Sequence, residues 1–203
     1  MIKNVIFDIG NVLVNFSWAE YMQKLFPGQD ELIAKLNNAV WGDGRWERLD
    51  AGDDPEKVWS SIIKICPENE PEIKKIISRV GETLTKRAGT HEWIKDLKSR
   101  GYKVYYLSNY SRFVMDANPE VLDFLPLMDG GVFSCDVKLL KPEIEIYDSL
   151  AKKYNLVPSE CVFIDDLFVN VQGAILYGFK GIQCVNQEQA KQDLNKLLLS
   201  EAQ

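Results

Sequence analysis

Residues 4–13 read NVIFDIGNVL, a short apolar run followed by Asp8. Four further runs of the same kind lie at residues 103–107, 131–134, 161–164 and 181–185. Each run is nearly continuously apolar instead of alternating, which is typical of strands covered on both faces, as in a parallel sheet. Helical patterns fill the gaps from about residue 90 onward, and this alternation predicts βαβ units and an α/β fold.

Residues 16–86 break this rhythm, because they contain no strand-like run of comparable strength. Their apolar residues recur at helical spacing, and turn-rich pieces such as the GDG of residues 42–44 separate the periodic stretches. We therefore predict a small all-helical insertion at residues 16–86, placed after the first strand. The α/β core domain is then built from residues 1–15 and 87–203.

The composition is that of an ordinary globular protein. Apolar residues make up 46% and charged residues 27% of the 203 residues, which excludes collagen-like, mucin-like, coiled-coil and disordered classes. No apolar run reaches the roughly 18 residues of a membrane-spanning helix, and the first residues do not resemble a signal peptide, so we expect a cytoplasmic protein. The net charge of −6 disfavours nucleic acid or an anionic membrane as a partner. We expect a monomer or homodimer.

The histidine and cysteine content narrows the chemistry further. The single histidine, His91, falls in the first turn of a predicted helix and is interpreted as structural. Any Ser-His or Cys-His mechanism would depend on that one residue. The four cysteines show no CxxC spacing and are interpreted as small buried side chains in a reducing compartment. Carboxylates, lysine and a hard metal are therefore the expected tools of an enzyme with this sequence.

Polar side chains follow four of the predicted strands, where ligands bind in open α/β sheets. In chain order they are Asp8, Ser108, Asn109, Lys141, Asp165 and Asp166. Single aspartates at strand ends can merely cap helices, but complementary groups at four strand ends argue for a site. Carboxylates that share one edge of a sheet repel each other unless a cation neutralises them, and oxygen ligands favour Mg²⁺ over zinc. The hydroxyl, amide and ammonium groups would then bind an anion such as a phosphate.

The same segments resemble the four motifs of the haloacid dehalogenase (HAD) superfamily of hydrolases. They read FDIGNVL at residues 7–13, LSN at 107–109, KP at 141–142 and FIDD at 163–166. The resemblance implies a HAD-like, Rossmann-type parallel sheet flanked by helices, with residues 16–86 as a C1-type cap. The FD-[hydrophobic]-GNV start is most similar to the small α-glucose-1-phosphatase-like members.

The resemblance also implies a covalent phosphatase mechanism. Asp8 would attack phosphorus and form an aspartyl-phosphate that water hydrolyses. Mg²⁺ would be held by Asp8, the backbone carbonyl of Gly10 and the acidic pair. Within that pair, Asp166 would be the direct ligand, and Asp165 would act directly or through water.

The remaining motif residues would bind the phosphoryl group. Ser108, Asn109 and Lys141 are implied to contact its oxygens, and one such donor is typically worth ~10²–10³ in rate. Lys141 also counts as catalytic, because its loss would leave the carboxylates unbalanced. The stretch from Trp41 to Asp53 is the expected specificity segment.

Within that segment, Trp41 and Trp46 would stack on a sugar ring, while Arg45 and Glu47 would hydrogen-bond sugar hydroxyls. The tryptophans could equally pack the cap against the core. These features predict a Mg²⁺-dependent phosphomonoester hydrolase whose partner is a small phosphorylated metabolite, specifically a sugar phosphate.

One departure from the family pattern concerns acid–base catalysis. Most family phosphatases have an aspartate two positions after the nucleophile, which protonates the leaving oxygen and then activates water. Here that position is Gly10. Three explanations stay open: a good leaving group such as the anomeric hydroxyl of a sugar 1-phosphate, an acid from the cap such as Glu47, or slow turnover.

Other functions stay open as alternatives. Gly10 is compatible with a non-catalytic, regulatory phosphate-binding protein. A 2-haloacid dehalogenase is the next alternative, although the family's dehalogenases use no metal and do not keep an acidic pair such as Asp165-Asp166. A phosphotransferase such as a sugar phosphomutase would need water excluded from the aspartyl-phosphate.

Overall fold

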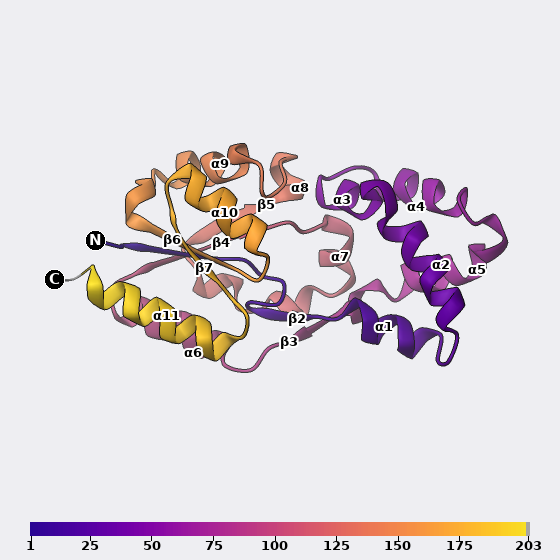
Figure 1. The fold of residues 1–203 in the computed structure, drawn as a ribbon, viewed down its shortest axis with the longest axis horizontal. Helices are drawn as coiled ribbons and strands as arrows, with labels where there is room; N and C mark the ends of the chain where they lie inside the picture. Colours follow the sequence, from indigo (N-terminus) through magenta and orange to yellow (C-terminus); the bar gives the residue numbers. More distant parts are fainter. Residues whose placement is uncertain (202–203) are drawn as a thin grey trace.

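The computed structural model describes residues 1–201 and contains a five-stranded sheet with helices on both faces (Figure 1). The strand order is β5-β4-β1-β6-β7, and every pairing is parallel. This confirms the α/β fold class and the predicted strands. Their bounds are β1 (Asn4–Phe7), β4 (Lys103–Ser108), β5 (Gly130–Phe133), β6 (Cys161–Asp165) and β7 (Lys180–Gln183).

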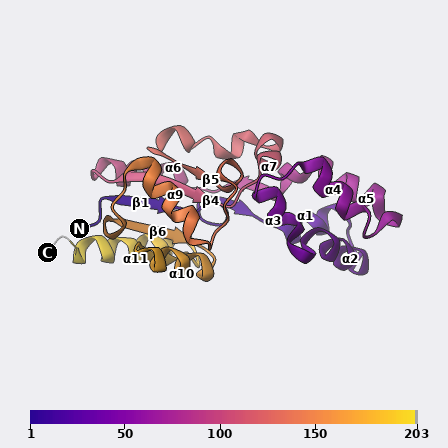
Figure 2. The ribbon, with the colours of Figure 1, turned by 90° about the horizontal axis from the view of Figure 1, so that it is seen from above.

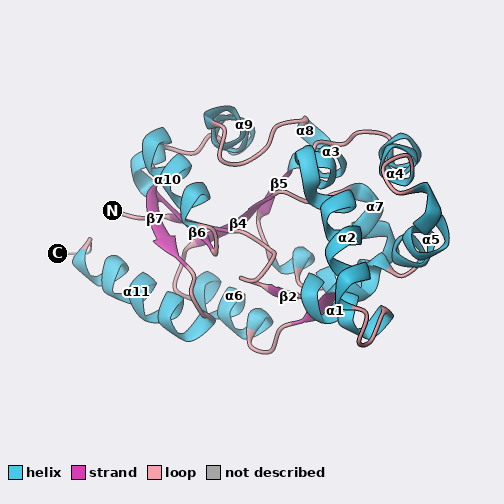
Figure 3. Ribbon diagram, turned by 45° about the vertical axis from the view of Figure 1, so that its right-hand side comes forward, coloured by secondary structure: helices cyan, strands magenta, loops and turns pink. Residues whose placement is uncertain are grey.

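Helices account for most of the remaining described chain (Figure 3). The α-helices are α1 (Trp18–Leu25), α2 (Asp30–Trp41), α3 (Arg45–Asp50), α4 (Pro55–Ile63), α5 (Glu70–Ser78), α6 (Thr90–Ser99), α7 (Arg112–Ala117), α8 (Ser134–Val137), α9 (Ile144–Tyr154), α10 (Phe168–Tyr177) and α11 (Gln187–Ser200). Short 3-10 helices also occur, namely η1 (Gly42–Gly44), η2 (Pro67–Asn69), η3 (Val80–Thr83), η4 (Pro119–Leu122), η5 (Leu125–Leu127) and η6 (Pro158–Glu160). Within residues 1–201, no helix combines the length and apolar character needed to cross a membrane.

The two faces of the sheet are covered by different helices. α9 and α10 pack on one face, and α6 and α11 pack on the other (Figure 1). Successive residues of β1 therefore enter different clusters: Ile6 packs with the first pair of helices, and Val5 and Phe7 with the second. The Phe7 ring lies 4.6 Å from that of Trp93 on α6, edge to face. Burial on both faces explains why these strands are continuously apolar.

The segment between β1 and α6 forms a helical unit that lies beyond one end of the sheet (Figures 1 and 2). Helices α1 to α5 pack around buried side chains such as Met22, Leu36 and Ile62, which continue the core of the sheet. A turn at the start of α4 is capped by Asp54, whose carboxylate accepts the Glu56 amide at 3.0 Å.

Two short strands at the base of this unit were not predicted. β2 (Val14–Phe16) and β3 (Leu84–Lys86) pair antiparallel, where the chain leaves and re-enters the core. Asn15 Nδ2 donates to Thr85 Oγ1 at 3.2 Å across this ladder. Runs of three residues give no periodic signal, so the sequence pattern could not reveal them.

Candidate active site

Three carboxylates meet at the carboxyl-terminal edge of the sheet. Asp8 follows β1, Asp165 is the last residue of β6, and Asp166 comes next. The register pairs Phe7 with Ile164, so the aspartates that follow these residues emerge at the same level. One carboxylate oxygen from each aspartate lies within 4.8 Å of the others. Such a cluster needs positive charge to be stable.

One lysine holds two of these carboxylates. Lys141 Nζ donates to Asp8 Oδ1 at 2.8 Å and to Asp165 Oδ2 at 2.6 Å. Burial opposes the charge of Lys141, but the attraction of Asp165 and Asp8 outweighs it and holds the lysine pKa above its ordinary value. Burial raises the pKa of Asp8 to about 7, against the opposing attraction of Lys141. When all three carboxylates are ionised, the one ammonium leaves two negative charges in surplus, which a divalent cation would neutralise.

The two aspartates after β6 differ in how many donors they already have. Asp165 accepts from the same lysine, from the Leu167 amide at 2.8 Å and from Asn170 Nδ2 at 3.1 Å. The carboxylate of Asp166 accepts one side-chain hydrogen bond within the described chain, from Asn11 Nδ2 at 3.1 Å, and it lines a cavity. Oxygens of Asp166 are therefore available to a metal, whereas those of Asp165 are occupied.

Ser108 and Asn109 lie beside this cluster at the end of β4. Ser108 is buried, and both residues line the cavity. The side chain of Asn109 spans the backbone of Lys141, donating to its carbonyl at 3.1 Å and accepting its amide at 2.9 Å. Asn109 therefore positions the lysine, a role that the sequence motif did not reveal. Asn11, which bonds to Asp166, was also missed as a site residue, because only the fold brings it to that aspartate.

The cavity in front of the cluster has a volume of about 430 Å³. Asp8, Gly10 and Lys141 lie on its core side, and Trp41, Trp46, Glu47 and Asp50 of α2 and α3 lie on its other side. Apolar side chains complete much of the wall, namely Phe16, Leu84, Val114, Leu167 and Val169. Asp50 was not singled out from the sequence, which offered only Glu47 as an acid from this segment.

The two tryptophans both line the cavity and pack with other aromatic side chains. Trp41 and Trp46 stack with ring centroids 4.7 Å apart and an interplanar angle of 25°. The centroid of the Trp18 ring lies 5.3 Å from the centroid of each of these rings, edge to face. Trp41 and Trp46 therefore pack within the helical unit and also line the cavity, so packing and substrate contact do not exclude each other.

Arg45 requires a correction, because it does not line the cavity. It is buried, and its Nε donates to the Ala39 carbonyl at 2.6 Å. Its other nitrogens donate to the Asn38 carbonyl at 2.8 Å and to Asp43 Oδ2 at 2.9 Å. These bonds tie α3 to the end of α2 and leave Arg45 in a structural position, outside the lining of the cavity.

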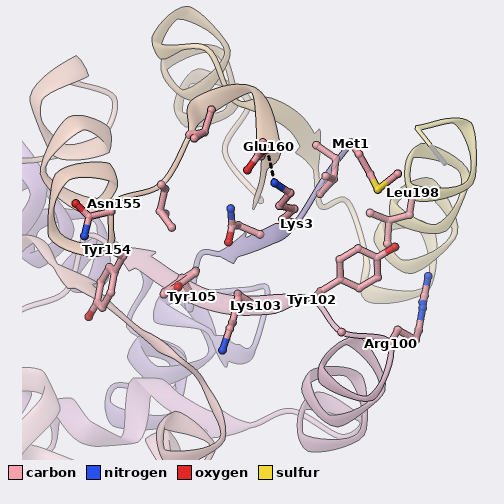
Figure 4. Close-up of a pocket in the computed structure, with 15 residues that line it drawn as sticks. Met1, Lys3, Arg100, Tyr102, Lys103, Tyr105, Tyr154, Asn155, Glu160 and Leu198 are labelled. Atoms are coloured by element: carbon pink, nitrogen blue, oxygen red, sulfur yellow. Dashed lines mark hydrogen bonds and ion pairs between the residues drawn. The ribbon is translucent and has the colours of Figure 1, made fainter.

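A second cavity, of about 530 Å³, lies around the start of β1 and β4 (Figure 4). Its lysines are already paired: Lys3 with Glu160 at 2.7 Å, and Lys103 with Asp129 at 3.1 Å. Within residues 1–201, the trio at the carboxyl edge is the only close group of three potential metal ligands. The reactive chemistry is therefore concentrated in the first cavity.

Comparison with known proteins agrees with this geometry. The family model "Hydrolase: haloacid dehalogenase-like hydrolase" matches residues 2–178. A D-ribitol-5-phosphate phosphatase from Bacteroides thetaiotaomicron is 28% identical over 98% of this chain and 100% of its own length. The sesquiterpene phosphatase astK from Aspergillus oryzae is 23% identical over 97% of this chain and 96% of its own.

A solved structure gives a fold-level match. It is a HAD family enzyme from Bacteroides thetaiotaomicron in complex with magnesium and inorganic phosphate. The TM-score is 0.71 at 23% identity, and the match covers 90% of this chain and 94% of the other. This likeness shows that the two chains share a fold.

Proposed function

The chain belongs to the haloacid dehalogenase-like hydrolases, and from that premise we propose that it is a Mg²⁺-dependent phosphomonoester hydrolase. The observation that supports this most is the trio of Asp8, Asp165 and Asp166, two of which bond to Lys141, beside a cavity that Asp8, Asp166 and Lys141 line. One solved HAD family enzyme of similar fold binds magnesium, and two curated relatives that match nearly the whole chain are phosphatases.

In this proposal Asp8 is the nucleophile. Its carboxylate attacks phosphorus while the bond to the leaving oxygen breaks, and water then hydrolyses the aspartyl-phosphate to regenerate Asp8. Lys141 and Ser108 bind the phosphoryl oxygens, and Asn109 holds the lysine in place.

The residues present fit a hard divalent cation. Asp8, Asp166 and the backbone carbonyl of Gly10 would hold Mg²⁺, with Asp165 fixing the lysine beside them. The ion would neutralise phosphate charge and orient the phosphate for attack.

The cavity wall suggests the substrate class. Trp41 and Trp46 offer an aromatic surface, and Glu47 offers acceptors for hydroxyl groups. We propose a sugar or sugar-alcohol phosphate, with sugar 1-phosphates included as the α-glucose-1-phosphatase resemblance implies. Residues 16–86 would act as a C1-type cap that shapes this pocket over a core of residues 1–15 and 87–203.

Phosphate release from a substrate panel tests the proposal. The panel contains glucose 1-phosphate, glucose 6-phosphate, ribitol 5-phosphate and p-nitrophenyl phosphate, each assayed with Mg²⁺ and with EDTA. We expect release that needs Mg²⁺ and is lost in Asp8→Asn. Halide release from a 2-haloacid without Mg²⁺ would instead identify a dehalogenase, and phosphate binding without any turnover would identify a regulatory protein.

A further inference from the structure

The residues next to the nucleophile Asp8 in the sequence include no general acid that could protonate the leaving oxygen. An ordinary alkoxide, such as the one that ribitol 5-phosphate would release, is too basic to depart readily without a proton, so hydrolysis of such a substrate needs a general acid near the leaving oxygen. Position 10 offers no side chain for this task, since it is glycine. The acid must therefore come from another residue that lines the cavity.

The cavity has few titratable side chains to choose from. They are Asp8, Glu47, Asp50, Tyr110, Lys141 and Asp166. Three of these belong to the nucleophile, lysine and metal positions. Burial raises the pKa of Tyr110 well above its ordinary value, which makes it a poor proton donor, and Glu47 is exposed to solvent. Asp50 is the remaining group.

We propose that Asp50, at the end of α3, is the general acid and base of this enzyme, an inference that rests on the proposed phosphatase activity. Asp50 lines the same cavity as Asp8 and Lys141, but it comes from the opposite, helical wall. A group in that position can reach the side of the phosphate that bears the leaving oxygen, because Asp8 must attack from the core side.

The backbone of Asp50 is fixed to the core. Its carbonyl accepts Ser134 Oγ at 2.5 Å, and that same Oγ accepts the Tyr110 amide at 2.9 Å. Two residues on, Gly52 has φ +81°, and a Cβ there would lie 2.6 Å from the Cys135 carbonyl oxygen. The turn after α3 thus presses directly on the backbone of α8. Asp50 is held by the segments that follow β4 and β5, of which the first begins directly after Ser108 and the second leads to Lys141.

The electrostatic surroundings suit a proton donor. Burial, together with the negative charges of Glu47 and Asp8, raises the pKa of Asp50 to about 8, against the opposing effects of Lys141 and a backbone hydrogen bond from Ser111. The titratable groups that act on Asp50 from the packed elements are Glu47 on α3, Asp8 after β1, Tyr110 after β4, Cys135 on α8 and Lys141 before α9. A pKa close to the working pH is the best value for a group that both gives and takes a proton.

The proton balance of the reaction then closes. In the first step the Asp50 carboxyl group gives its proton to the leaving oxygen, as the phosphorus–oxygen bond breaks and the bond from Asp8 to phosphorus forms. In the second step the Asp50 carboxylate takes a proton from water, whose oxygen bonds to phosphorus while the bond to Asp8 breaks. The products are the alcohol and inorganic phosphate, and both aspartates return to their starting states.

Two substrates with different leaving groups test this role in Asp50→Asn. Ribitol 5-phosphate releases an alkoxide that needs a proton, whereas p-nitrophenyl phosphate releases a stable anion that does not. We expect kcat/KM for the alkyl phosphate to fall about 10²–10⁴-fold, and kcat/KM for the aryl phosphate to stay within a few-fold. With the aryl phosphate, loss of the base should slow the second step, so a burst of nitrophenolate equal to the enzyme concentration should precede slow turnover.

Matched variants separate this role from a structural one. Asp30→Asn removes an exposed carboxylate of the same helical unit, which accepts a hydrogen bond from Gln23, and it should leave both substrates unaffected. Equal losses on both substrates in Asp50→Asn, or no loss on either, would overturn the role of Asp50 and leave the phosphatase standing. If Glu47→Gln, and not Asp50→Asn, lost activity on the alkyl phosphate but kept it on the aryl phosphate, Glu47 would be the general acid. A parent enzyme inactive on both substrates would refute the phosphatase itself, and this inference with it.

Discussion

Lys141 Nζ lies 2.8 Å from Oδ1 of Asp8, and both side chains are buried. The same ammonium also bonds to Asp165 at 2.6 Å. One buried cation therefore compensates two buried carboxyl groups that are far apart in sequence and lie at the ends of adjacent strands, β1 and β6. This arrangement links the chemistry of the site to the stability of the fold.

Lys141→Met should destabilise the protein as well as inactivate it. Removing the partner of a buried ion pair typically costs about 3–5 kcal/mol, because the carboxylates are left uncompensated. Saturating Mg²⁺ should restore part of the loss, since it binds the folded state. Urea unfolding with and without Mg²⁺ measures this. Lys152→Met breaks an exposed pair with Asp148 and should cost less than about 1 kcal/mol; equal costs for the two variants would contradict the account.

The two aspartates after β6 should respond differently to substitution by asparagine. Asp166→Asn should raise the Mg²⁺ concentration for half-maximal activity at least about 10-fold with little change in stability, because few protein groups depend on it. Asp165→Asn should lower the free energy of unfolding, since it disturbs the bonds to Lys141, Leu167 and Asn170. Magnesium titration of activity and urea unfolding of both variants test the contrast, which the reverse pattern would refute.

Asp50 should make stability depend on pH in a predictable direction. Its pKa is raised in the folded state to about 8, from about 3.9 when unfolded. The native protein therefore holds this proton more tightly, and the associated stability is lost as pH rises from about 4 through about 8. The unfolding free energy of Asp50→Asn minus that of the parent should become more positive between about pH 5 and pH 8.5. A constant difference would show that Asp50 is ionised in the cavity.

Installing an acid at position 10 should rescue the loss of Asp50. A Cβ on Gly10 would meet only Asp8 Oδ2, at 3.9 Å, and the backbone there is not left-handed. Gly10→Asp in the Asp50→Asn background should therefore recover at least about 10-fold of the lost kcat/KM on ribitol 5-phosphate. Gly10→Ala in the same background fills the space without an acid and should recover nothing. No difference between these double variants would argue against a missing proton donor.

Trp41 and Arg45 are close in sequence, but we expect substitution of Trp41 to affect substrate binding and substitution of Arg45 to affect stability. Trp41→Ala removes an aromatic wall of the cavity and should raise KM for a sugar phosphate more than it lowers kcat. Arg45→Met should instead lower the free energy of unfolding by about 1.5–3 kcal/mol, because its hydrogen bonds are lost. Steady-state kinetics and thermal unfolding of the two variants distinguish the roles. A large KM effect in Arg45→Met would return that residue to the substrate site.

Much of the α/β core and of the polar cluster at its carboxyl edge could be predicted, because the carboxyl ends of parallel strands meet at one edge of the sheet. Asp8, Ser108 and Asp165 each stand at the end of a continuous apolar run, and parallel pairing brings such ends to one edge. Lys141 lies beyond α8 and is brought to these residues by the hydrogen bonds between Asn109 and its backbone. The location of the protein in the cell and its oligomeric state stay predictions.

The helical side of the site was less accessible to sequence reasoning. Asp50 reaches the cavity because Gly52 and Ser134 fix the turn after α3, and these contacts join segments more than 80 residues apart. Arg45 looked like a substrate ligand, but the break between α2 and α3 turns its side chain toward backbone carbonyls. Helical periodicity identifies elements, whereas their packing decides which polar side chains face a cavity.

In the proposed mechanism, Asp8 becomes phosphorylated during turnover. Acid-quenched reactions of Asp50→Asn with p-nitrophenyl phosphate and Mg²⁺, followed by peptide mass spectrometry, test it most directly. We predict a phosphorylated peptide that contains Asp8, present in near-stoichiometric amount during the burst and absent with EDTA. Nitrophenolate release with no phosphorylated peptide, or phosphate on a peptide that lacks Asp8, would contradict the account.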